Sequence, residues 1–139
     1  MTARPTIGVV GLGTMGLGIA QVYAQAGFSV IATDAHQPAR DSARDRLAQA
    51  LHSRVTAGKL TEADRDATLS RLTVAEDLAA LTPCGLIIEA IVEKLEAKQA
   101  LFAALEPLIA PDAILASNTS SLPIHAIAAG LKHPDRVLA

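Results

Sequence analysis

Short apolar runs alternate along the chain with longer stretches in which apolar residues recur at helical spacing. The runs predict buried strands at 7–10, 28–33, 72–74, 86–90 and 114–116, and the beginning of another at 137–138. The longer stretches predict helices at 15–26, 37–56, 95–109 and 122–131, and a further helix that starts at Thr61. Strands that alternate with helices in this way indicate parallel strands joined by crossover helices. The sequence therefore predicts a doubly wound α/β sheet.

Composition limits the number of domains and the kinds of partner. The chain has 139 residues, of which 50% are apolar, and this suits one domain with a buried core over residues 1–139. A net charge of −2 and an aromatic content of 2% argue against nucleic-acid binding. No apolar stretch reaches the roughly 18 residues of a membrane span, and residues 1–13 lack a cleavable signal. Cys84 is the single cysteine, so no internal disulfide is possible, and we expect a cytoplasmic protein. We expect no metal site.

The first predicted strand ends in a glycine-rich turn with the spacing G-x-G-x-x-G, formed by Gly11, Gly13 and Gly16. The turn opens a predicted helix, and an acid follows roughly 20 residues later at the end of the second strand, as the Rossmann-type dinucleotide fingerprint requires. Gly11 permits the tight turn, Gly13 lets a pyrophosphate approach the backbone, and Gly16 lets the helix pack closely on the sheet. The alternative is a glycine-rich turn that only shapes the fold.

Asp34, at the end of the second predicted strand, is the acid that selects the cofactor. Its carboxylate can accept hydrogen bonds from the adenosine ribose hydroxyls and would repel a 2′-phosphate. Residues 35–37 contain no arginine that could neutralise such a phosphate. The sequence therefore favours NAD over NADP, and the alternative is an aspartate that merely caps the next turn.

Three further segments resemble the 3-hydroxyacyl-CoA dehydrogenase family. They read LHSRVTAGKLTEADRDATLSRL at 51–72, LIIEAIVEKLEAKQALF at 86–102 and LASNTSSLPI at 115–124. The glycine loop, the ribose acid, E-A-x-x-E and S-N-T-S follow one another in the family's order, and the resemblance runs from about residue 6 to the end. SRVTAGKLT at 53–61 resembles the branch that acts on 3-hydroxyadipyl-CoA in phenylacetate breakdown, to which the 3-hydroxybutyryl-CoA branch is similar. The resemblance implies an NAD-dependent oxidation of (S)-3-hydroxyacyl-CoA to 3-oxoacyl-CoA in fatty-acid β-oxidation or phenylacetate-type degradation.

The resemblance also implies roles for residues after the fourth and fifth predicted strands. Glu93 would lie near the nicotinamide side of NAD, and Lys98 near the cofactor on the following helix. Ser120 would face both cofactor and substrate and could hydrogen-bond the 3-oxygen, while Asn118 would line the same loop. Two alternatives stay open: Glu93 and Lys98 could be surface charges, and 117–121 could be an N-cap cluster for the last helix.

The complete set expected to bind the cofactor combines the glycine loop, the ribose acid and these later positions. Its members are Gly11, Leu12, Gly13, Thr14, Met15, Gly16, Asp34, Glu93, Lys98, Asn118 and Ser120.

For the substrate, the resemblance implies that the helix pair after the second strand projects from the domain and helps to hold coenzyme A. Arg54 and Lys59 are the expected contacts to its phosphates, together with Ser120 on the acyl side. The alternative for the two basic residues is an ordinary solvated helix face.

Hydride transfer at a 3-hydroxyl needs an acid–base group, usually a histidine. None of the chain's four histidines, His36, His52, His125 and His133, has a partner acid placed as that chemistry requires. In the family, the catalytic histidine follows the strand that begins here at Val137, and a helical second domain forms the dimer. We therefore expect residues 1–139 to be an NAD-binding domain that ends before the catalytic histidine and the helical second domain. We expect this domain to be inactive alone, and we expect the parent protein to be a homodimer.

Two other functions remain open. One is a stand-alone NAD-binding module that senses redox state or serves in an assembly. The other is a domain of the 3-hydroxyisobutyrate dehydrogenase type, which shares G-L-G-x-M-G, although Asp34 and S-N-T-S argue against it.

Overall fold

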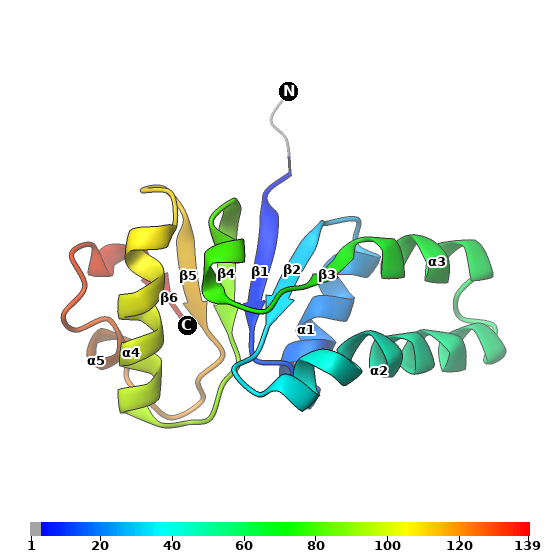
Figure 1. The fold of residues 1–139 in the computed structure, drawn as a ribbon, viewed down its shortest axis with the longest axis horizontal. Coiled ribbons are helices and arrows are strands. Elements are labelled where there is room, and N and C mark those ends of the chain that lie inside the picture. The colour runs from blue at the N-terminus through cyan, green and yellow to red at the C-terminus, as the bar shows by residue number, and fades with distance from the viewer. Residues whose placement is uncertain (1–3) are drawn as a thin grey trace.

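The computed structural model describes residues 4–139 and contains one six-stranded sheet in which every neighbouring pair is parallel (Figure 1). The strand order is β3-β2-β1-β4-β5-β6. The strands are β1 (Thr6–Val10), β2 (Val30–Thr33), β3 (Leu72–Val74), β4 (Cys84–Glu89), β5 (Ile114–Ser117) and β6 (Val137–Leu138). The predicted doubly wound sheet is therefore confirmed, including the short strand at 137–138.

The strand order reverses between β1 and β4. The chain runs outward from β1 through β2 to β3, then returns to place β4 on the other side of β1. In the register, Val10 pairs with both Thr33 and Glu89, and Glu89 pairs with Ser117. The carboxyl ends of four strands thus lie level with one another at the point of reversal, where open α/β sheets bind their ligands.

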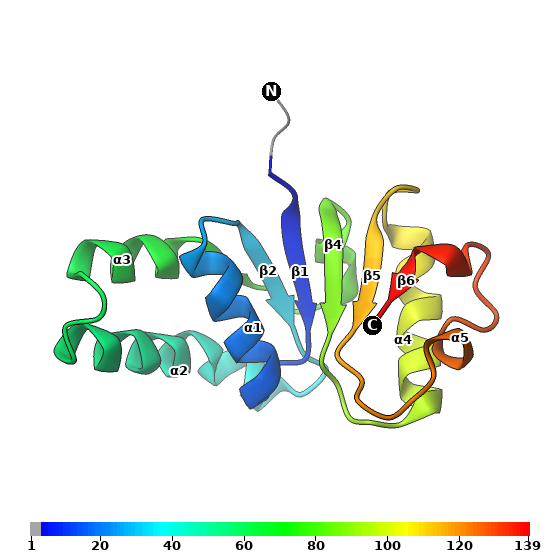
Figure 2. The same cartoon turned by 180° about the vertical axis from the view of Figure 1, so that it is seen from behind.

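Helices cover both faces of this sheet. They are α1 (Thr14–Gln25), α2 (Gln37–Thr56), α3 (Glu62–Ser70), α4 (Leu95–Leu105) and α5 (Ile124–Ile127). Helix α1 lies in front of the sheet in Figure 2, whereas α4 lies in front in Figure 1, so the two helices pack on opposite faces.

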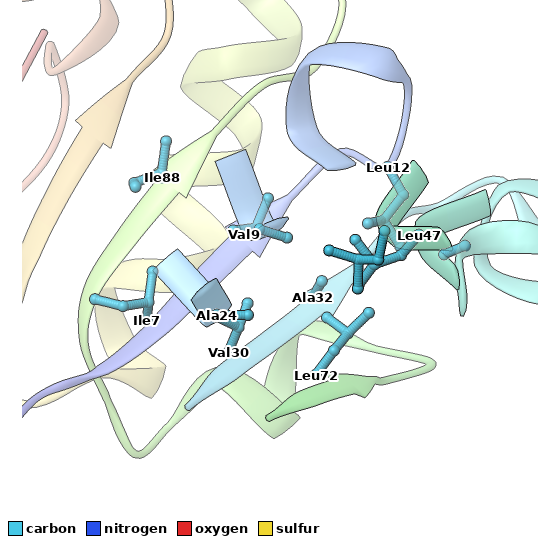
Figure 3. Packing of buried hydrophobic residues seen from close by; sticks show 12 residues of the cluster. Ile7, Val9, Leu12, Ala24, Val30, Ala32, Leu47, Leu72 and Ile88 are labelled. Atoms are coloured by element: carbon cyan, nitrogen blue, oxygen red, sulfur yellow. The ribbon is translucent and has the colours of Figure 1, made fainter. Parts of the chain in front are cut away.

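Two buried clusters correspond to the two faces. Because successive side chains of a strand point to opposite faces, Ile88 joins the cluster under α1 while its neighbour Ile87 joins the cluster under α4. Figure 3 shows the first cluster, to which the sheet contributes Val9 and Ala32 and helix α2 contributes Leu47.

The α2–α3 pair forms a hairpin that projects beyond the edge of the sheet (Figures 1 and 2). Gly58, with φ of +75°, ends α2, and the Thr61 hydroxyl caps α3 by accepting a hydrogen bond of 3.1 Å from the Asp64 backbone N–H. Leu47 and Leu51 are fully buried and fasten the inner part of α2 to the sheet. The bounds predicted for α2 are those observed.

Two helix predictions were wrong in length. The helix predicted at 95–109 ends at Leu105 and continues as a 3-10 turn, because Pro107 cannot donate a backbone hydrogen bond. The helix predicted at 122–131 is reduced to α5, one turn long. Leu122 precedes a proline, which disfavours helical backbone at that residue, and Gly130 adopts φ of +89° just beyond the turn.

Four strands also differ from prediction at one or both ends. Strand β1 begins at Thr6 rather than 7. Strand β2 begins at Val30 rather than 28, β4 runs from Cys84 to Glu89 rather than over 86–90, and β5 extends to Ser117. Two short 3-10 segments, Leu78–Leu81 and Pro134–Arg136, complete the connections. Within residues 4–139, no helix is both long and apolar enough to cross a membrane.

Leu47→Ala should lower the free energy of unfolding by about 2–5 kcal/mol, because it removes a fully buried side chain between α2 and the sheet. Gln49→Ala, at an exposed position of the same helix, is the matched control and should change the free energy by less than about 0.5 kcal/mol. Urea denaturation of both variants measures the difference. Equal effects would contradict the packing of α2 on this sheet.

Candidate cofactor-binding site

The glycine-rich turn joins β1 to α1 through two positions where a side chain would collide with backbone. Gly11 has φ of +109°, and a Cβ there would meet the carbonyl oxygen of Ala90. A Cβ at Gly16 would meet the carbonyl oxygen of Gly11. These two glycines therefore let the turn, the start of α1 and the end of β4 approach one another closely.

Gly13 differs from these two because a Cβ there would have no heavy atom within 4 Å. Its backbone, with φ of −72° and ψ of −169°, is one that other residues adopt. Gly13 is the N-cap of α1, where no side chain caps the helix and no acid occupies the first turn. The positive end of the helix dipole is thus exposed beside open space, as an anion such as pyrophosphate requires.

The peptide groups of Leu12 are held from both sides. Its N–H donates to Oδ2 of Asp34 at 2.7 Å, and its carbonyl oxygen accepts a hydrogen bond of 2.7 Å from the Arg46 guanidinium of α2. Sequence reasoning missed Arg46, because nothing in the local pattern shows that α2 returns to the glycine turn. These two bonds fix the turn in place without a ligand.

Asp34 borders the same turn and has acceptor capacity left. Its Oδ1 accepts a hydrogen bond of 2.8 Å from the His36 N–H, so it does cap the following turn. Two backbone donors occupy only part of the roughly four lone-pair sites of a carboxylate. Asp34 can therefore accept hydrogen bonds from ribose hydroxyls as well. Arg40 lies closer than the sequence suggested, since its guanidinium donates to the Asp34 carbonyl oxygen at 2.7 Å.

A cleft runs along the carboxyl ends of the central strands. Its larger pocket, of about 660 Å³, is bordered by Gly11, Gly13 and Asp34 on one side and by α4 on the other. A second pocket of about 380 Å³ is lined by Met15, Glu93 and residues 118–120. Both pockets share Ala90 and Ile91, so the glycine turn lies between two adjoining halves.

Beneath the smaller pocket lies a buried group of charges. Glu89, at the end of β4, is fully buried and accepts hydrogen bonds from the Lys98 ammonium at 2.6 Å, from the Ile91 N–H at 2.9 Å and from the Ser117 hydroxyl. Lys98, on α4 and only 1% exposed, also contacts Glu93 at 3.1 Å. The three charges link β4, α4 and the loop between them.

Glu93 in turn holds the serine-rich loop after β5. Its carboxylate accepts hydrogen bonds from the backbone N–H of Ser120 at 3.0 Å, and from the hydroxyls of Thr119 at 2.9 Å and Ser121 at 3.2 Å. The backbone N–H of Ser120, followed by Lys98 and Thr119, lowers the pKa of Glu93 to about 2. Glu93 is therefore a carboxylate at every physiological pH.

These contacts exclude one of the alternatives and the Lys98 part of another. Lys98 is not a surface charge, because it is buried between two carboxylates. The loop at 117–121 is not the N-cap of α5, since that cap is Pro123 without a side-chain hydrogen bond. Sequence reasoning missed Glu89 and Ser117 as site residues. The signal that could have found Glu89 is an acid at the end of an otherwise apolar strand.

The remaining predicted residues lie in two places. Thr14, Asn118 and Ser120 are exposed around the glycine turn and the smaller pocket. Arg54 and Lys59 are exposed at the tip of the α2–α3 hairpin and do not line either pocket. None of the residues lining the two pockets is a histidine.

Comparison with known proteins agrees with this geometry. A model of the family described as "3-hydroxyacyl-CoA dehydrogenase, NAD binding domain" matches residues 6–139. The chain is 46% identical over 133 residues to a 3-hydroxybutyryl-CoA dehydrogenase of Mycobacterium tuberculosis, covering 95% of this chain and 46% of that protein. It is 47% identical over 132 residues to a 3-hydroxyadipyl-CoA dehydrogenase of Escherichia coli, covering 95% of this chain and 28% of that one.

Solved structures give the same result. A crystal structure of 3-hydroxybutyryl-CoA dehydrogenase from Escherichia coli superposes with a TM-score of 0.93 at 46% identity, over 98% of this chain and 29% of that chain. The chain therefore belongs to the family of NAD-binding domains of 3-hydroxyacyl-CoA dehydrogenases. It spans less than half the length of these relatives.

Glu93→Gln should change how the free energy of unfolding depends on pH. The folded-state pKa of about 2 lies below the ordinary value of 4.5, so ionised Glu93 stabilises the folded chain fully above about pH 4.5. This stabilisation is lost as the pH falls toward 2. The difference between parent and variant should thus be largest at neutral pH and shrink under acid, as urea denaturation at pH 7, 4 and 3 would measure.

Glu106 serves as a control for this measurement. The backbone N–H groups of Lys132 and His133 also lower the pKa of Glu106, which lines neither pocket. The destabilisation caused by Glu106→Gln should therefore also be largest at neutral pH and shrink as the pH falls below the ordinary value of 4.5, and it should add to that of Glu93→Gln. A Glu93→Gln effect of constant size at all three pH values would contradict the hydrogen-bonded carboxylate described here.

Proposed function

We propose that this chain binds NAD along the cleft and supplies the cofactor half of a 3-hydroxyacyl-CoA dehydrogenase. The observation that supports this most strongly is the sequence of features along one cleft: a ribose acceptor, an uncapped helix N-terminus and a charged pocket. In this arrangement the adenosine ribose contacts Asp34, the pyrophosphate lies over Gly13, and the nicotinamide enters the pocket bordered by Glu93.

NAD rather than NADP is the cofactor that this geometry favours. A 2′-phosphate beside Asp34 would face an ionised carboxylate whose position is fixed by the Leu12 and His36 N–H groups. Arg40 and Arg46 are the nearby cations described above, and their guanidinium groups donate to the carbonyl oxygens of Asp34 and Leu12. The family's own description also names NAD.

The proposed reaction is oxidation of a (S)-3-hydroxyacyl-CoA to the 3-oxoacyl-CoA. When bound, NAD accepts the hydride that leaves C3 of the substrate. Ser120, exposed beside the smaller pocket, orients the 3-oxygen by hydrogen bonding. The hydroxyl proton must pass to a base, and no histidine lines the described cleft.

We propose that the substrate carries a short or dicarboxylic acyl chain. The names of two relatives support this, since one is a 3-hydroxybutyryl-CoA dehydrogenase and the other a 3-hydroxyadipyl-CoA dehydrogenase. We propose that Arg54 and Lys59, at the hairpin tip, contact the phosphates of coenzyme A. We also propose that the parent enzyme works in the cytoplasm and is a homodimer; sedimentation of the parent protein would test the dimer.

Gly13→Val should abolish NAD binding and leave the chain folded. The valine side chain would occupy the space proposed for the pyrophosphate, whereas the backbone of Gly13 suits any L-residue. Gly18→Ala is the matched control, because Gly18 lies in α1 and a Cβ there also meets open space. Calorimetric titration with NAD and NADP, beside thermal melting, measures both properties. A folded valine variant that binds NAD normally would contradict the placement of the pyrophosphate over Gly13.

No histidine lines the two pockets, and general acid–base catalysis contributes typically 10²–10⁴-fold to a rate. The 139-residue chain should therefore reduce acetoacetyl-CoA with NADH at least about 100-fold more slowly than the Mycobacterium tuberculosis relative. NADH absorbance measures both rates. Comparable rates would mean that one of His36, His52, His125 or His133 acts in catalysis.

A further inference from the structure

The charges around the smaller pocket do not cancel. Glu89 and Glu93 are carboxylates, and Lys98 is the one cation among residues 4–139 that contacts them. The cluster formed by these three residues, the Glu89–Lys98–Glu93 cluster, therefore carries one unit of net negative charge. Glu93 is its outermost member, with 36% of its side chain exposed, and it borders the pocket directly.

The cluster is held rigidly before any ligand binds. Glu89 accepts from three donors in the protein interior, and the Glu93 carboxylate accepts from the loop after β5. Fixed charges need no rearrangement when a ligand arrives, so their electrostatic effect on that ligand is realised in full. Burial of Lys98 and Glu89 also keeps water from screening them.

NAD and NADH differ only in the nicotinamide ring, which carries a positive charge in the oxidised form and none in the reduced form. In the orientation proposed above, that ring lies in the pocket bordered by Glu93, and the adenosine half lies in the larger pocket. We propose that the Glu89–Lys98–Glu93 cluster discriminates between the redox states, favouring oxidised NAD over NADH by attraction of the charged ring. This inference rests on the proposed function, since it requires the nicotinamide in the smaller pocket.

The expected size follows from Coulomb's law. With an effective dielectric constant of about 20, one unit of charge shifts the equilibrium about tenfold at roughly 12 Å from the ring, and by more at shorter distances. Partial exposure of Glu93 reduces this, so we expect about five- to tenfold. The effect should appear in the ratio of the two dissociation constants, Kd(NADH)/Kd(NAD), whatever the absolute affinities are.

Two isosteric substitutions test the proposal in the 139-residue chain. Glu93→Gln and Glu89→Gln each make the cluster neutral, and both should lower Kd(NADH)/Kd(NAD) about five- to tenfold. Calorimetry measures the affinity for NAD, and the fluorescence of bound NADH measures the affinity for NADH. A merely structural role would weaken binding of both redox forms alike and leave the ratio unchanged. Should Glu89→Gln fail to fold, the more exposed Glu93 position still decides the question.

Two controls separate this charge effect from others. Glu76 borders the larger pocket, where both redox forms present the same adenosine, so Glu76→Gln should change the two affinities by equal factors. Glu106→Gln, which removes a similarly hydrogen-bonded acid outside both pockets, should leave the ratio at its parent value.

The outcomes are distinguishable. If the parent chain binds neither NAD nor NADH, the proposed function itself fails. If both bind and Gly13→Val prevents it, but the ratio is unchanged in Glu93→Gln, the site stands and the discrimination by charge is overturned. A ratio lowered equally by Glu93→Gln and Glu76→Gln would also overturn it, because the effect would then reflect the net charge of the cleft.

Discussion

The ion pair between Glu89 and Lys98 is the interaction on which the geometry of the cleft depends. It joins the end of β4 to α4 at the point where the strand order reverses, and both side chains are buried. Removing one partner of a buried pair typically destabilises a protein by about 3–5 kcal/mol. The two residues therefore fix α4 against the sheet. Lys98 also contacts Glu93, whose carboxylate in turn holds the loop after β5 by hydrogen bonds.

The two halves of the cleft are organised by different means. In the adenosine half, backbone geometry dominates: Gly11 and Gly16 permit close approach, and Asp34 and Arg46 hold the peptide groups of Leu12. In the other half, side-chain charges determine the arrangement. This division matches what each half would have to recognise, since pyrophosphate contacts need open backbone N–H groups, whereas a ring whose charge changes can be distinguished by fixed charges.

Most of the fold could be predicted because its signals are local: apolar strands, glycine stops and helical spacing. The prediction failed where a proline changed the backbone, as at Pro123 before the short α5. The glycine turn and Asp34 could be found because their spacing is fixed by one β-α-β unit. The partners of Arg46 and Glu89 could not, because tertiary packing sets them. Lys98 was expected near the cofactor, but its burial between two carboxylates depends on how α4 docks.

The most direct test of the account is a nuclear magnetic resonance titration of the isotope-labelled chain with AMP and with NAD. AMP should shift backbone amide signals around Asp34 in the larger pocket, and NAD should in addition shift those of Met15 and residues 118–120 in the smaller pocket. The hairpin tip at 54–59, which lines neither pocket, should be unaffected by both. If NAD shifts only the amide signals that AMP also shifts, or mainly those of the hairpin, the result would contradict a dinucleotide that spans the two halves of the cleft.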